Sequence, residues 1–148
     1  MRDLVVSLGV VLADIEREKG PFQVKCLVTP DPVEPMWDLV LVAQWFWPER
    51  KQTLDFLVPR VMGRLDYEHL MHFSGLVIYP PDSDNPLTEA LREIQDNHRH
   101  HRDDWLRAGG LVTVQTRLPQ ARLVIPLDDE PPSADTASEW NATHQACA

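Results

Sequence analysis

Two apolar runs near the start of the chain, 22–29 and 37–47, most constrain what it can fold into. The first alternates apolar and polar residues, which is typical of a strand with one face in water. The second is apolar on both faces of a strand, and such strands are usually covered on both sides. Three prolines in 30–36 cannot donate ladder hydrogen bonds, so we expect a loop there. The sequence therefore predicts two strands of one sheet, with the second at the sheet centre.

Helical patterns flank these two strands. Apolar residues at helical spacing predict an amphipathic helix over 3–18, which Lys19-Gly20-Pro21 should end. A second helical stripe follows Pro48 and contains Pro59, which should kink or split that helix. Asp66 is placed to cap a short helical segment that runs to His72.

The second half of the chain predicts three further strands and a longer helix. The alternation of 73–79 indicates a third strand. Asn85-Pro86 should then start a helix, with Asn as the cap and Pro in the first turn, that Gly109-Gly110 stops. Residues 111–116 and 121–125 are expected to form a closing hairpin.

This order of elements predicts an α+β or mixed α/β fold. We expect a single globular α+β domain over 1–127, with about five strands in one mixed sheet and helices packed on it. The third strand, the long helix and the fourth strand fit a right-handed parallel crossover within an otherwise antiparallel sheet. The order of the strands does not follow from the sequence.

The negative charge of the chain is concentrated at its C-terminal end. The net charge is −9, and residues 128–148 hold five acids and no Lys or Arg, which leaves −4 for 1–127. Because 128–148 is also rich in Pro, Ser, Ala and Thr, we expect an acidic disordered tail. Such a tail either binds a partner or is a solvated end without a role.

The sequence favours an intracellular setting. We expect a cytoplasmic protein, because the chain has neither an apolar stretch long enough for a bilayer nor a secretory leader. Cys26 and Cys147 form no recognisable disulfide framework or zinc pair. Arginines on the long helix alternate with acids, so a nucleic-acid partner is not expected.

One polar segment, 96–105, has the residue types of a metal site. If the helix persists there, Asp96, His100 and Asp103 or Asp104 lie on neighbouring turns. One imidazole and two carboxylates suit Mn²⁺, Fe²⁺ or Zn²⁺ with positions open for water, and such a site supports hydrolysis. The simpler interpretation is a solvated helix end, with Asp96 and His100 as an ordinary pair. A weaker second group, Glu68, His69 and His72, also shares one short helix.

Trp47 is the clearest candidate for a binding residue. It stands beside Pro48 at the end of a predicted strand, where an aromatic ring can anchor a partner or a second copy of the chain. It can equally pack over the following helix. The chain has no nucleophile elbow, HExxH, paired CxxC or phosphate-binding glycine pattern.

Three stretches resemble a family of small uncharacterised bacterial proteins. They are Gly20-Pro21-Phe22, the run from Trp37 to Phe46, and Gly110-Leu111-Val112-Thr113-Val114. The resemblance covers most of 1–126 and implies a bacterial, intracellular setting. It implies no activity and no functional residue.

Two functions fit these observations, and whether the chain is an enzyme stays open. The first is a non-enzymatic protein-interaction or regulatory protein, without a cofactor or a membrane. It would bind a protein partner, or form a homo-oligomer, through a sheet edge, the Trp47 region or the acidic tail. The alternative is a small metal-dependent hydrolase, acting on phosphoesters, that holds a divalent metal with Asp96, His100 and Asp104.

Overall fold

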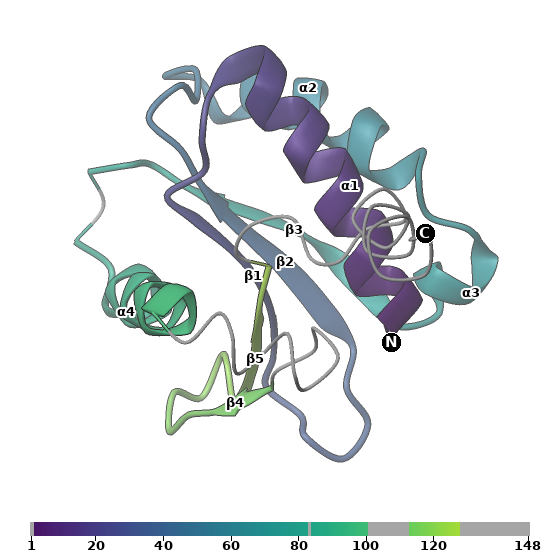
Figure 1. The fold of residues 1–148 in the computed structure, drawn as a ribbon, viewed down its shortest axis with the longest axis vertical. Helices are drawn as coiled ribbons and strands as arrows, with labels where there is room; N and C mark the ends of the chain where they lie inside the picture. Colours follow the sequence, from purple (N-terminus) through teal and green to yellow (C-terminus); the bar gives the residue numbers. More distant parts are fainter. Residues whose placement is uncertain (1, 83, 101–112, 128–148) are drawn as a thin grey trace, which may run out of the picture.

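The computed structural model describes residues 2–82, 84–100 and 113–127 (Figure 1). Its elements, in chain order, are α1 (Arg2–Lys19), β1 (Val24–Thr29), β2 (Trp37–Val42), α2 (Arg50–Met62), α3 (Tyr67–Leu70), β3 (Phe73–Tyr79), α4 (Pro86–His100), β4 (Val114–Gln115) and β5 (Leu123–Pro126). The strands form one mixed sheet in the order β3-β2-β1-β5-β4. The predicted α+β fold with a five-stranded mixed sheet is confirmed.

The connections of the sheet differ from the predicted ones. Strands β2 and β3 are parallel, and α2 and α3 join them. The other described neighbours are antiparallel, including the closing hairpin of β4 and β5. The crossover was expected around the long helix, but α4 instead carries the chain from β3 at one edge to β4 at the other. The reason is that β5 takes the place beside β1, which leaves β4 at the far edge.

Helices cover both faces of the sheet. Helices α1 and α2 pack on one face, and α4 packs on the other against β1 and β5 (Figure 1). Residues from α1, α2 and the sheet form the larger core, including Leu8, Leu12, Leu39, Leu57 and Ile125. The smaller core joins Leu87 and Leu91 of α4 to the opposite face of the sheet. The sheet is therefore the middle layer of three.

Strand β1, rather than β2, is the centre of this sheet. Both strands lie in the interior of the sheet, as expected for β2. Strand β2 ends at Val42, and the rest of its apolar run forms a loop. The prediction that the first apolar run, 22–29, has one solvent-exposed face is wrong, since every residue of β1 is buried. The polar residues that suggested a solvent-exposed face, Lys25 and Thr29, are themselves buried.

A partly buried ion pair allows Lys25 to face the core. Its Nζ donates to Oε1 of Glu16 at 2.7 Å, and Oε2 of the same carboxylate accepts from the Phe22 N–H at 2.9 Å. Glu16 belongs to the last turns of α1, so one side chain fastens this helix to the start of the central strand. A buried charge is tolerated only with such a partner.

A buried amide fastens the other layer to the same strand. Gln95 of α4 is fully buried, and its Oε1 accepts from the Lys25 N–H at 2.9 Å. Its Nε2 donates to the Gln23 carbonyl at 3.0 Å. The amide thus supplies main-chain hydrogen bonds beyond the end of β5, as a neighbouring strand would.

Most of the predicted helix ends are confirmed. Gly20 ends α1 with a φ of 126°, a conformation that favours glycine. Asn85 Oδ1 accepts from the Leu87 N–H at 2.8 Å and caps α4, while Asp66 and His69 form a capping box on α3. Helix α2 continues through Pro59 to Met62 and is not split. The predicted end of the long helix and the tail lie outside the described residues.

We expect the two halves of the ion pair to differ in their effect on stability. Glu16→Ala leaves the Lys25 side chain, 6% exposed, without a counter-charge, and should lower the free energy of unfolding by about 3–5 kcal/mol. Lys25→Met leaves the 22% exposed Glu16 hydrated and bonded to Phe22, so its loss should stay below about 2 kcal/mol. Urea unfolding measures both, and equal losses would contradict the asymmetry.

We expect Gln95→Leu to destabilise the protein although it keeps the side-chain volume. The change leaves the Lys25 N–H and the Gln23 carbonyl without the amide, at a cost of about 2–4 kcal/mol. The matched control is Gln115→Leu, at an exposed position of β4, which should change stability by less than about 0.5 kcal/mol. Thermal or urea unfolding of the two variants compares them, and similar values would exclude a structural role for the amide.

Candidate functional site

A cleft of about 630 Å³ opens at the carboxyl ends of the parallel strands β2 and β3. Ligands of sheets with parallel strands commonly bind at this end, because the chain leaves both strands there and its loops diverge. The lining comes from the loop after β2, the first turns of α2, and the end of β3 with the residues that follow. These residues are Phe46, Trp47, Pro48, Arg50, Thr53, Val77, Ile78, Tyr79, Pro80, Pro81 and Asp82. We call this the β2/β3 cleft.

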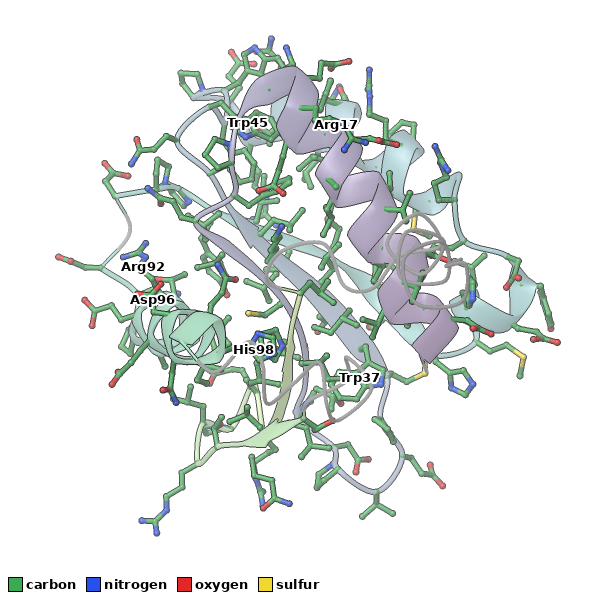
Figure 2. The ribbon with its side chains drawn as sticks, in the orientation of Figure 1. Arg17, Trp37, Trp45, Arg92, Asp96 and His98 are labelled. Carbon is green, nitrogen blue, oxygen red and sulfur yellow. The ribbon has the colours of Figure 1, made fainter. Side chains whose placement is uncertain are left out.

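Trp47 is held firmly in the wall of the β2/β3 cleft. Its ring lies 5.4 Å from that of Phe56 on α2 and 6.1 Å from that of Trp45, between centroids. The buried Thr53 hydroxyl donates to the Trp47 carbonyl at 3.3 Å. Trp45 is fixed in turn, because its Nε1 donates to the Gly20 carbonyl at 3.0 Å beside the end of α1 (Figure 2). Trp47 thus packs on the second helix, one of the two alternatives that the sequence left open, and the same residue lines the cleft.

Cations surround the aromatic wall. Lys19 Nζ lies 4.9 Å from the Trp47 ring centroid and 5.2 Å from that of Phe56. Arg60 covers Phe56, with its Cζ 3.7 Å from the ring centroid. These contacts stabilise the rings electrostatically and hold them in place. Inside the cleft the charged lining residues are Arg50 and Asp82, both exposed.

The outer edge of β3 borders the same cleft. Among the described residues, β3 pairs with β2 on one side and with no strand on the other. Leu76, Val77 and Tyr79 are half-buried, and no charged residue occurs from Phe73 to Pro81. Natural sheets usually protect an edge strand with charges or prolines within it. A register shift between Trp37 and Asp38 places an irregularity at Ser74, so 75–79 is the regular part of this edge.

The predicted metal site is only partly described. Asp96 is exposed on the outer side of α4, near Arg92 (Figure 2). His100 is the last described residue of α4, and its side chain, Asp103 and Asp104 lie outside the described residues. Within the described part of the chain, no three His, Cys, Asp or Glu residues could hold a metal ion. The site of Asp96, His100 and Asp104 therefore stays a prediction.

The second predicted group has a structural use. His69 Nδ1 accepts from the Asp66 main-chain N–H at 3.4 Å, and the main-chain N–H of His69 donates to Asp66 Oδ1 at 3.0 Å. His69 thus completes the capping box of α3. Helix α3 and helix α4 lie on opposite sides of the sheet (Figure 1). The Glu68, His69 and His72 group therefore lies apart from α4, the helix that ends at His100.

Sequence reasoning found Trp47 but missed its neighbours. Arg50, Tyr79 and Asp82 carried no motif. Arg50 follows Trp47 at the start of α2, whereas Tyr79 and Asp82 meet Trp47 only because β2 and β3 are parallel neighbours. The hydrophobic pattern that places both strands in one sheet was visible in the sequence, but the order of the strands was not.

Comparisons with known proteins identify no relative: no protein-family model, curated protein or solved structure matches the chain. The resemblance to small bacterial proteins stays a prediction. None of the described helices combines the length and apolarity that a bilayer span needs.

Proposed function

We propose that this chain is a non-enzymatic interaction protein that binds a polypeptide partner at the β3 edge and the β2/β3 cleft. One observation carries the proposal: an edge strand without charges ends at an aromatic cleft. The two features that the sequence suggested separately, a sheet edge and the Trp47 region, form one continuous surface.

The two features suit an added strand. A partner segment in extended conformation would continue the sheet beside 75–79, with main-chain hydrogen bonds supplying affinity. Its side chains beyond the strand would reach the cleft, where Trp47 and Tyr79 offer apolar ring surface. The contacts of Trp47 with Phe56 and Trp45 order the ring in advance, so binding costs little side-chain entropy.

The lining of the cleft favours binding over catalysis. Its charged residues are an arginine and an aspartate, and it contains no His, Cys, Lys or Glu. His is the commonest general acid or base, and the candidates that the cleft does hold, Asp82 and Tyr79, have no His, Cys or Lys beside them in the lining. An apolar aromatic wall with charges at its rim is instead typical of a protein-binding surface.

The setting of this function is part of the proposal. The resemblance of 20–22 and 37–46 to small bacterial proteins supports a bacterial, cytoplasmic location. The five acids of 128–148 support a second contact region for partners with basic surfaces. A regulatory role follows if the partner is an enzyme or another control protein.

We expect a photoreactive group in the cleft to capture a polypeptide. Tyr79→p-benzoylphenylalanine keeps an aromatic ring in the cleft, and illumination in cells of the source organism should yield a covalent adduct. The matched control carries the same residue in place of Gln115, on the opposite edge of the sheet, and should yield none. Denaturing gels and mass spectrometry detect the adducts. Absence of an adduct at position 79, or the same adducts at both positions, would overturn the proposal.

A further inference from the structure

We infer that the partner at this surface is a second copy of the chain. Two β3 strands would pair antiparallel across a two-fold axis at Val77 and join the two sheets into one. The inference rests on the proposed function and specifies its partner. The supporting observation is that the features at one end of the edge strand are complementary, in shape and in charge, to those at the other end.

The regular part of β3 fits a copy of itself. With Val77 opposite Val77, Gly75 lies opposite Tyr79, and the two face the same side of the sheet. A Cβ at Gly75 would meet nothing within 4 Å, so there is open space beside it for the partner's Tyr79 ring. An aromatic ring across from a strand glycine is a known stabilising pair in sheets.

An apolar projection stands at the other end of the strand from the cleft. Helix α3 and its C-cap residue precede β3 and present three exposed apolar side chains: Tyr67 (77% exposed), Leu70 (37%) and Met71 (57%). We call them the α3 knob. The knob lies at the amino end of β3, while the β2/β3 cleft lies at its carboxyl end. An antiparallel arrangement therefore brings each knob to the partner's cleft, twice per dimer.

Charges favour the same arrangement. Exposed Glu68 belongs to the helix of the α3 knob, and exposed Arg50 lines the β2/β3 cleft. In the antiparallel pair, Glu68 of each chain approaches Arg50 of the other. A parallel pair would instead bring knob to knob and cleft to cleft, with like charges together. Opposite charges and complementary shapes thus favour the same two-fold symmetry, which closes at a dimer.

These features favour a copy over an unrelated peptide. An unrelated peptide would need only the edge and the cleft. The α3 knob, with Glu68 beside it, has no use in that case and would leave three large apolar side chains in water. In the two-fold dimer, the knob, the edge and the cleft are all buried together.

The first test measures the molecular mass in solution of the purified full chain at several concentrations. The same measurement is made on variants in which one charge of the proposed contact is reversed. Sedimentation equilibrium should show a species of twice the 17.0 kDa chain mass. Arg50→Glu or Glu68→Arg should each weaken dimerisation by about tenfold or more, because the reversal acts at both symmetry-related ends. The control Arg122→Glu changes charge equally at an exposed position next to β5, which two strands separate from β3, and should leave the dimer intact.

Mixing the two reversed variants separates this geometry from a general charge effect. In a mixed dimer each contact again joins opposite charges, so the mixture should dimerise although each variant alone does not. The chain that carries both reversals should dimerise as well. A wild-type monomer at every concentration, or a dimer that ignores both reversals, would overturn the inference.

The second test fixes the register. In a Cys147→Ser background, Val77→Cys places two thiols at the axis, close enough for a disulfide under mild oxidation. The control Ser74→Cys belongs to the same strand, but its two copies lie far apart in this register. A crosslinked dimer at position 77 and none at 74 supports the register, and the reverse overturns it.

The two proposals fail in different ways. A Tyr79 adduct of one chain with another copy supports both. An adduct with a different protein, together with a wild-type monomer, upholds the proposed function and overturns the inference. Absence of any adduct, together with a monomer, overturns both.

Discussion

The contact between Glu16 and Lys25 allows this sheet to bury its central strand on both faces. Lysine faces the core only because a carboxylate from α1 meets its ammonium group at 2.7 Å. The same carboxylate binds the Phe22 N–H, so it fixes both the angle of α1 and the start of β1. On the opposite face, Gln95 binds the main chain of Lys25 and Gln23. Two helices from opposite layers thus converge on one short stretch of β1.

The surface proposed for binding is a consequence of this central attachment. Because α4 is tied to β1 and packs on β1 and β5, it covers the middle of the sheet rather than β3. Helix α2 returns the chain from the carboxyl end of β2 to the amino end of β3, so α3 is placed beside the start of the edge strand. The parallel connection therefore separates the α3 knob from the β2/β3 cleft by the length of one strand. That separation makes an antiparallel, two-fold pairing self-complementary.

Local sequence chemistry predicted much of the fold, and long-range pairing accounts for the rest. The bounds of β3, the caps at Asp66 and Asn85 and the end of α1 at Gly20 depend on adjacent residues, which the sequence shows directly. The prediction of a solvent-exposed face on β1 was wrong. The alternating pattern shows that Lys25 is polar, but it does not show that Glu16, nine residues earlier in the chain, allows Lys25 to be buried. Trp47 was recognisable from its place at the end of an apolar run. Its partners Tyr79 and Asp82 were not, since they follow a different strand and strand order is not encoded locally.

The irregularity at Ser74 also helps to explain how the β3 edge can select one partner and one pairing register. An uncharged edge strand invites pairing with many chains and in many registers. The irregularity ends the regular ladder at Gly75, and Pro80 ends it on the other side, so only five residues remain for an added strand. Within that span, a shift by one residue would turn the Tyr79 ring away from the open space at Gly75. A short edge limited at both ends, with a distinct feature beyond each end, selects one partner register without any charge inside the strand.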